Sequence, residues 1–508
     1  MPCPPIEGEA ANVAKASTGA QPELADEFCE DCGYQPELKR TLGSFQVFAV
    51  SFAFISVAVG IFSTYDDVLQ NSGPVGIWLW VVVAIGQVLV ALVYAQFAAR
   101  IPLSGSFYQW GSRLANPKIG WGFGWLTVCF VSFGVVAVDN ALASQAFMPL
   151  FGMAPNEDTA RLITLGVLLI QALLVVFSTR IVGMINASAV GLELAIVVVL
   201  SIALVIAVLV TGGGAAENLT SRGVTENAPD YFAVGGGLMV AMIMGLATLV
   251  GFESAANMAE EAKDPFRSVP RAIVGSVLAA GVLGLLFLIT LTVAIKDIPR
   301  VTASDSPVAL IIRDQLGPVM ERMFLVGITV AFFGAGMVTI SACSRIVFAM
   351  SRDARFPAHR LMQRVNPRTH TPVPATILIF VIGVILMVAL PGAALLKLIV
   401  SGSILQAIVY LGTLVLYLAV RRKLGRKEGG FSLGRFELPV AIGALAWVLV
   451  ALFVLVSPAE AVVPVVITAG LIVVGGLYFL GMLIFNREAL ETEPGDADLF
   501  AVSSEVTE

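Results

Sequence analysis

Long runs of apolar residues, separated by short polar segments, occupy most of the chain. The runs are typically about 20 residues long, which is what a helix needs to cross roughly 30 Å of hydrocarbon, whereas a strand of a membrane barrel needs only about 10 residues. The pattern therefore predicts an all-α polytopic membrane protein with twelve transmembrane helices. The predicted helices cover residues 46–65, 76–99, 119–148, 159–179, 183–211, 233–261, 271–295, 322–350, 373–391, 395–420, 437–457 and 462–486. The division between the ninth and tenth helices rests on Pro391-Gly392, a pair typical of turns.

The composition excludes a soluble globular protein. Of the 508 residues, 57% are apolar and 13% are charged, whereas a soluble domain averages about 25% charged residues. A soluble core stops growing at roughly 250–300 residues, so a chain of this length could not bury so much apolar surface in water. Soluble enzymes and nucleic-acid-binding proteins are therefore excluded as main interpretations, and the lipid bilayer is the expected surroundings.

Residues for catalysis and metal binding are scarce. The two histidines, His359 and His370, both fall in a basic linker. No predicted helix contains a Ser-His pair or an HExxH motif, so we expect neither an enzyme nor a bound cofactor or metal. Cys29 and Cys32 form a CxxC pair, but a zinc site usually needs four ligands and no second pair lies nearby. The sequence assigns this pair no role.

Charge is distributed unevenly along the chain. Residues 1–40 and 487–508 are acidic, polar and poor in aromatic residues, so both tails are predicted to be disordered. Membrane proteins keep an excess of Lys and Arg on the cytoplasmic side. With twelve helices, 23 of the 30 Lys and Arg fall on the side of the termini, and the other seven are Arg161, Arg222, Lys296, Arg300, Arg313, Arg322 and Lys397. We therefore expect cytoplasmic termini and a twelve-helix domain, residues 41–486, in the plasma (inner) membrane.

Two of the predicted helices contain a related interruption. The first contains Val59-Gly60-Ile61-Phe62-Ser63 and the sixth contains Val250-Gly251-Phe252-Glu253-Ser254. The two segments lie five helices apart, so they cross in opposite directions, as in an inverted repeat. Glycine disfavours a continuous helix, and backbone groups freed within a bilayer survive only beside protein, a cavity or a ligand. The alternative is ordinary glycine-mediated helix packing.

If the helices are broken, the freed backbone groups form the natural binding site. Half-helix N-termini favour a carboxylate, and half-helix C-termini favour an ammonium or another cation. Gln406 shares a helix face with Ser403 and Tyr410 that should look inward. The predicted substrate-binding residues are Ala58, Val59, Gly60, Ile61, Val250, Gly251, Phe252, Glu253 and Gln406.

Several separated motifs carry a family resemblance. Residues 251–273 contain Gly-Phe-Glu, then Ala-Glu-Glu, Asp-Pro and Val-Pro-Arg-Ala-Ile, and similar matches occur at 102–110 and 344–353. This sequence resembles permeases of the amino acid–polyamine–organocation superfamily, most closely the amino acid/choline transporter branch. The resemblance implies a LeuT-like fold of two five-helix inverted repeats, residues 46–211 and 233–420, with two peripheral helices in residues 437–486. It also implies uptake or exchange of small amines or amino acids.

One departure from the family bears on the substrate. Many amino acid permeases have Gly-Ser-Gly in the first helix, where this chain has Ala58-Val59-Gly60. Backbone N–H groups could still bind a carboxylate there, but the hydroxyl is missing. This weakens the case for an ordinary α-amino acid.

Three of the carboxyl groups inside predicted helices stand out, because an ionisable residue there is a candidate for function. Glu253 follows the sixth-helix interruption and matches the family, which suggests a binding or gating role, or a structural bond to a freed N–H. Glu193 matches a position where some proton-coupled relatives carry Lys, which suggests proton coupling, a structural cation site or a hydrogen-bonded spacer. Asp139, beside Asn140, could recognise an amine or line a wetted outer cavity.

The coupling ion stays open between proton and sodium. Ser341 and Ser344, with Thr339, would face the first-helix interruption in this fold, and relatives in the wider fold bind sodium with such hydroxyls. The sequence thus predicts a secondary active transporter of a small amino acid or amine that works by alternating access, with proton-coupled uptake preferred. The alternatives are an exchanger and a non-transporting sensor on the same scaffold.

Overall fold

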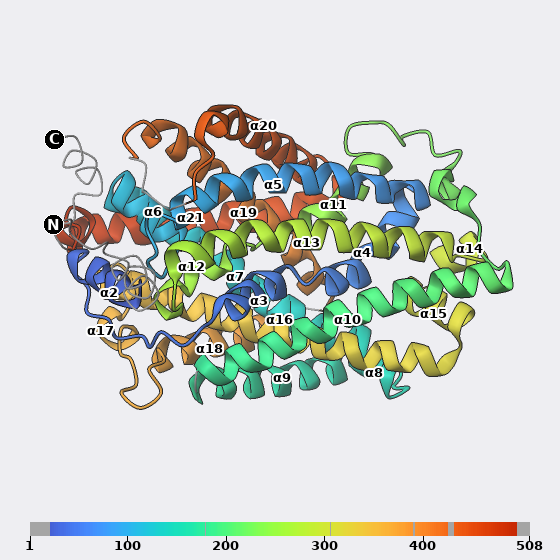
Figure 1. Cartoon of the computed structure of the whole chain (residues 1–508), viewed down its shortest axis with the longest axis horizontal. Coiled ribbons are helices and arrows are strands. Elements are labelled where there is room, and N and C mark those ends of the chain that lie inside the picture. The colour runs from blue at the N-terminus through green and yellow to red at the C-terminus, as the bar shows by residue number, and fades with distance from the viewer. Residues whose placement is uncertain (1–20, 178, 305, 390–391, 425–430, 495–508) are drawn as a thin grey trace, which may run out of the picture.

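The structure is a computed structural model that describes residues 21–177, 179–304, 306–389, 392–424 and 431–494. Within these residues the secondary structure is helical apart from a single bridge between Leu42 and Ala262. Figure 1 shows the helices running side by side along the long axis of the molecule. The predicted turn at Pro391-Gly392 falls partly outside the described residues.

Each of the twelve predicted segments coincides with helix. Ten helical segments in the described chain are long and apolar enough to cross a bilayer. The other two, α11 (Gly237–Thr248) and α18 (Val373–Ala389), are shorter and apolar. The ten are built from α3 with α4 (Ser44–Ile55, Val57–Asn71), α5 (Leu79–Ala98), α7 (Pro117–Ala141), α9 (Glu157–Phe177), α10 (Thr179–Thr211), α13 (Pro265–Val293), α16 (Pro318–Arg352), α19 (Gly392–Val420), α20 (Glu437–Val456) and α21 (Val462–Phe485).

Both interrupted segments are broken, but the first break is not where the sequence placed it. Helix α3 ends at Ile55 and α4 begins at Val57, with Ser56 between them in the left-handed region at φ 39°. Gly60 lies one turn later, inside α4. In the sixth segment, α11 ends at Thr248 and the short helix α12 (Ser254–Asn257) follows, with Gly251 between them at φ 75°. The prediction is therefore correct at Gly251 and wrong at Gly60.

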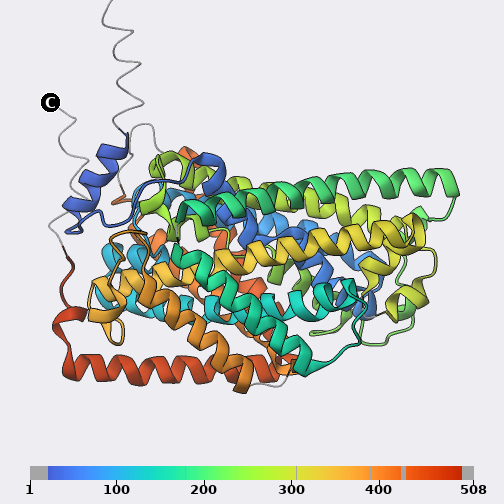
Figure 2. The same ribbon diagram turned by 90° about the horizontal axis from the view of Figure 1, so that it is seen from below.

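Helices that are five predicted segments apart pack against each other. Helix α4 contacts α11, α5 contacts α13, α7 contacts α16, and α9 contacts α18. The last two helices are more peripheral: α20 packs on α5 and α19, and α21 packs mainly on α19. In Figure 2, α21 runs along the lower edge of the bundle.

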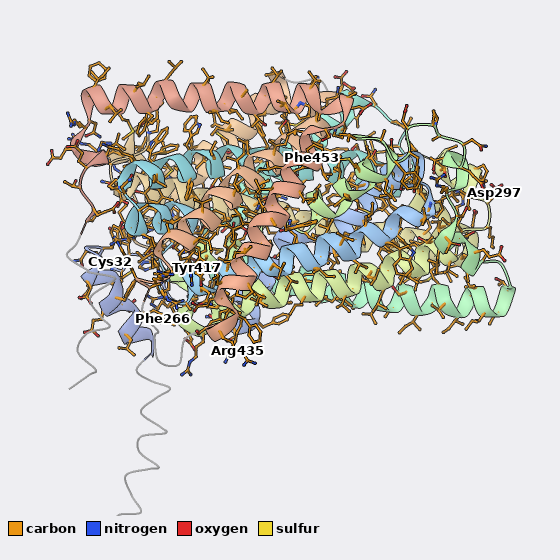
Figure 3. All side chains as sticks on the ribbon, turned by 90° about the horizontal axis from the view of Figure 1, so that it is seen from above. Cys32, Phe266, Asp297, Tyr417, Arg435 and Phe453 are labelled. Atoms are coloured by element: carbon orange, nitrogen blue, oxygen red, sulfur yellow. The ribbon has the colours of Figure 1, made fainter. Side chains whose placement is uncertain are left out.

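The two ends of the bundle are easily distinguished. One end, which we call the terminal face, carries α2 (Gln21–Asp31), α6 (Phe107–Leu114) and α17 (His359–Met362), whereas the opposite face carries α14 (Ile298–Thr302) and α15 (Pro307–Leu316) (Figure 1). In Figure 3, Cys32 and Arg435 lie toward the terminal face and Asp297 lies at the opposite face.

The tails correct the expectation of disorder. In the N-terminal tail, α2 and the segment after it bury Cys29, Cys32, Tyr34 and Leu38. In the C-terminal tail, a short 3₁₀ helix, Glu488–Leu490, buries Leu490. The prediction is thus wrong for residues 21–40 and 487–494, because a few apolar and aromatic side chains suffice to hold an acidic segment against the bundle. Residues 1–20 and 495–508 lie outside the described residues.

The breaks make a prediction about glycine. A Cβ at Gly251 would meet the ring of Phe54 and would sit at a φ that L-residues rarely adopt. Gly251→Ala should therefore lower the free energy of unfolding by about 1–3 kcal/mol, through overpacking and strain. Gly60→Ala should be similarly costly because its Cβ would overlap the Thr248 side chain. Thermal unfolding of purified protein in detergent measures the effect.

Gly275→Ala on α13 is the matched control. The nearest atom to its added Cβ is on Phe48 at 3.8 Å, an ordinary contact, so this variant should be neutral or slightly stabilising. If Gly251→Ala and Gly275→Ala unfold at the same temperature, the backbone at Gly251 is not constrained as described.

Candidate functional site

A cavity of about 110 Å³ lies where the two broken segments meet. Its walls come from α3, α4, α7, α11, α16 and α19. Of the residues predicted to bind substrate, Val59, Gly60 and Val250 line this cavity. The other six predicted residues are not among the described residues of its lining: Ala58, Ile61, Gly251, Phe252, Glu253 and Gln406.

Glu193 on α10 holds the first break. Its Oε1 accepts hydrogen bonds from the Ser56 hydroxyl at 3.1 Å and from the backbone N–H of Ala58 at 3.0 Å. The residue is buried, with only 3% of its surface exposed. The first N–H groups of a helix lack partners within the helix and carry partial positive charge. Glu193 therefore supplies a carboxylate to the N-terminus of α4.

The sixth-segment break is held by α19 in a comparable way. The hydroxyl of Tyr410 accepts a hydrogen bond from the backbone N–H of Gly251 at 3.2 Å and donates one to Glu253 Oε2 at 2.7 Å. Gln406 Nε2 donates to Glu253 Oε1 at 3.1 Å. Glu253 and Gln406 are thus in contact, and together with Tyr410 they stabilise the break. From α3, the Ser51 hydroxyl donates to the carbonyl of Phe252 at 2.6 Å.

An aromatic cluster separates the cavity from the terminal face. It consists of rings from α5, α6, the sixth-segment break and α19, with neighbouring centroids 5.2–6.0 Å apart. All of these side chains are buried. They pack together between the sixth-segment break and α6. The cluster is made of Tyr94, Phe107, Trp110, Phe252 and Tyr410.

Two carboxylate–arginine pairs lie beyond this cluster. Glu261 pairs with Arg345 at 2.7 Å with both side chains fully buried. Glu260 pairs with Arg352 through two contacts, at 3.0 and 3.2 Å. The arginines are seven residues apart on α16, so they lie on the same face of that helix. Paired charges with further hydrogen bonds are the form in which buried charge is tolerated.

The two serines predicted for coupling lie next to this pair. The Ser344 hydroxyl donates to the carbonyl of Ser341 at 2.8 Å and accepts a hydrogen bond from Arg345 at 3.1 Å. Arg345 also donates to the Ser341 carbonyl at 3.3 Å. A cation bound at Ser344 would therefore meet the positive charge of a guanidinium. By contrast, Thr339 lines the cavity.

Both tails contact the segment that follows α16. The ring of Tyr34 lies 3.4 Å from the Arg352 guanidinium and its hydroxyl donates to Asp353 at 2.9 Å. Arg355 donates to the carbonyls of Ala489 at 2.6 Å and Thr492 at 2.8 Å. Burial, with the nearby Asp353 carboxylate, raises the pKa of Tyr34. The N- and C-terminal tails thus meet on one short segment of the terminal face.

Cys29 and Cys32 lie in this region as buried thiols. Burial raises the pKa of both groups, so they stay protonated near neutral pH. The described residues hold no group of three or more His, Cys, Asp or Glu arranged for a metal.

Asp139 and Asn140 do not face the cavity. The Asp139 carboxylate accepts a hydrogen bond from Gln171 on α9 at 2.8 Å, and Asn140 donates to Thr164 at 3.5 Å. Their neighbours Val138 and Ala141 line the cavity instead. The helix turns the polar pair toward α9 and the apolar residues toward the site, which an unaligned sequence does not specify.

Two hydroxyl groups of the cavity have no hydrogen-bond partner in the described structure. They belong to Ser63 on α4 and Thr248 on α11. Thr248 is buried, with only 3% of its surface exposed. The sequence singles out Ser63 only as the end of a repeated pattern, and it gives no signal for Thr248. A hydroxyl at the last residue before a helix break is recognisable only once the break is located.

Sequence comparison with known proteins shows the family of this chain. Residues 42–484 match the family model described as amino acid permease. The chain is 27% identical over 452 residues to amino-acid permease BAT1 of Arabidopsis thaliana, covering 82% of this chain and 86% of the relative. It is 28% identical over 354 residues to the GABA-specific permease of Saccharomyces cerevisiae, covering 67% of this chain and 62% of the relative. A chain of apolar helices that matches this model across most of its length is an integral membrane protein and belongs to the amino acid permease family.

Proposed function

We propose that this permease is a secondary active transporter that moves a small amino acid or amine across the plasma membrane by alternating access. One observation carries the proposal: two broken helices lie side by side and a cavity opens between them. Interrupted helices near the midplane present backbone dipoles to a substrate without requiring a charged side chain. Relatives named for amino acids and for GABA support the substrate class.

We infer twelve membrane spans, of which the first ten form two inverted five-helix repeats. Such repeats are related by an axis in the membrane plane. A helix near that axis therefore packs against the equivalent helix of the other repeat. The pairs α4–α11, α5–α13, α7–α16 and α9–α18 all join segments five positions apart. Helices α11 and α18 are short for a span, but α11 continues through the break into α12. This continuation favours counting the broken segment as one span.

We also infer that the terminal face is cytoplasmic. Arg40, Arg113, Arg352 and Arg355 all take part in the contacts of that face, and basic residues accumulate on the cytoplasmic side of membranes. The aromatic cluster and both Glu–Arg pairs lie between the cavity and this face. The arrangement corresponds to a state closed toward the cytoplasm. Release of substrate inward would require these contacts to separate, as in other two-state transitions.

For coupling, we favour a proton carried by Glu193. Its carboxylate bridges α10 to the N-terminus of α4. Protonation would remove the negative charge opposite that helix end and weaken both hydrogen bonds. Proton binding and the shape of the break would thus be linked. Sodium coupling through Ser341 and Ser344 is less favourable beside the Arg345 guanidinium, and exchange without a coupling ion is the remaining alternative.

Transport itself is the first prediction here. Protein purified into proteoliposomes should accumulate or exchange at least one radiolabelled member of a panel of neutral amino acids, GABA, choline and polyamines. Gly251→Leu, checked for insertion, should show no uptake because its side chain would enter the break. If no panel member is accumulated or exchanged by the wild-type protein, the proposal is wrong.

The second prediction concerns Glu193. Glu193→Gln keeps the size and hydrogen-bonding capacity of the side chain but cannot carry a proton. It should retain substrate exchange between equal pools and lose accumulation driven by a pH gradient. Glu460→Gln, at an exposed position between α20 and α21, is the control and should keep both activities. If Glu193→Gln still accumulates substrate in response to a pH gradient as well as wild type, Glu193 only supports the break.

A further inference from the structure

The cavity between the breaks has an uncharged wall. Within the described part of the chain, no residue that lines it is Asp, Glu, Lys, Arg or His. Its polar side chains are all hydroxyls, contributed by serines and threonines of α4, α11, α16, α19 and the first break. Transfer of a net charge into a site without a compensating charge is strongly unfavourable. The wall therefore selects against a ligand with a net charge.

The carboxylates nearest to the breaks do not compensate for this. Glu193 is directed at the N-terminus of α4 and Glu253 at Gln406 and Tyr410 of α19. Asp139, one residue from the lining residue Val138, is directed at Gln171. None of these three side chains lines the cavity, and this includes Asp139, whose Oδ2 has no partner among the described residues. A polyamine in the cavity would therefore find no counter-charge on its wall. The same holds for the side chain of a cationic amino acid.

The backbone supplies two partial charges of opposite sign. Helix α4 begins at Val57 and α11 ends at Thr248, and both ends reach the cavity. A helix N-terminus is equivalent to roughly +0.5 charge and a C-terminus to roughly −0.5. The two ends lie close together, since a Cβ on Gly60 would overlap Thr248. Glu193 occupies the Ala58 N–H at the first of these ends, so a ligand carboxylate is favoured there when Glu193 carries the proton of the proposed coupling. The end of α11 favours an ammonium.

Thr248 and Ser63 add a specific requirement for hydrogen bonding. Their hydroxyls line the cavity and have no partner among the described residues. An unpaired buried polar group costs roughly 1–3 kcal/mol, so a ligand or water that pairs with these hydroxyls is favoured. Other hydroxyls of the wall are satisfied by their own helices, for example Thr339 by the carbonyl of Ala335 at 2.8 Å.

We propose, on the basis of the proposed transport function, that the substrate is a zwitterion of zero net charge and that the Thr248 hydroxyl contacts it. Neutral amino acids and GABA belong to this class, whereas spermidine, lysine and glutamate do not. A cavity of about 110 Å³ has room for several water molecules, so the substrate is small. Thr248 then determines specificity, because it stands at the negative helix end with a free hydrogen-bonding group.

Competition measures the substrate class directly. Wild-type proteoliposomes take up a transported radiolabelled solute in the presence of unlabelled L-alanine, L-serine, GABA, L-lysine, L-glutamate or spermidine. At least one of the first three should compete, and the last three should each require at least about tenfold higher concentration, because they bring net charge into the site. If spermidine or lysine competes as well as the best zwitterion, the inference is wrong although the transport function stands. If nothing is transported, the transport function fails first.

Substitutions at Thr248 measure the contact. Thr248→Val preserves shape and removes the hydroxyl, so the apparent KM for the best zwitterion should rise by about three- to tenfold, the equivalent of one neutral hydrogen bond. Thr248→Ser should restore most of the affinity. Thr376→Val on α18 is the control, since that buried hydroxyl already donates a hydrogen bond to the carbonyl of Pro372, four residues earlier. An unchanged KM in Thr248→Val, with unfolding temperature equal to the control, overturns the role of Thr248.

Discussion

The two helix breaks impose the central constraint on this protein, because backbone N–H and C=O groups freed inside a bilayer must find partners within the protein. Each break is supported by a helix that follows later in the chain. Glu193 on α10 reaches the N-terminus of α4, and Tyr410 on α19 reaches the backbone of Gly251. Side chains that the sequence suggests as substrate contacts, such as Glu253 and Gln406, thereby hold a break, and the polar side chains of the cavity wall are hydroxyls.

This division explains why the structure keeps charge away from the cavity. Charged groups inside a membrane are tolerated when they are paired, and the strongest pairs lie toward the terminal face. Glu260 and Glu261 hold two arginines of α16, and the N-terminal tail adds the ring of Tyr34 to one of them. Specific ionic and aromatic contacts therefore hold the terminal face together, whereas the walls around the cavity are largely apolar.

The family match and the lining of the cavity bear on different aspects of this protein. The match over residues 42–484 establishes the family, but relatives at 27–28% identity with different named substrates do not define what this chain carries. The lining of the cavity is more informative on that point. Its uncharged wall supports the proposal of a ligand without net charge, independently of any relative's name.

The sequence by itself determined the membrane character, the helical class and the approximate position of each helix, because the length of an apolar run reflects the thickness of the bilayer. It also located the break at Gly251, where glycine allows a positive φ. Tertiary structure alone decided that the first break lies at Ser56, since a carboxylate from α10 stabilises a conformation that serine does not favour by itself. It likewise decided that Asp139 faces α9 and that Thr248 faces the cavity. The direction of a side chain within an apolar helix depends on its neighbours in space, and a single sequence with little hydrophobic contrast between helix faces does not record them.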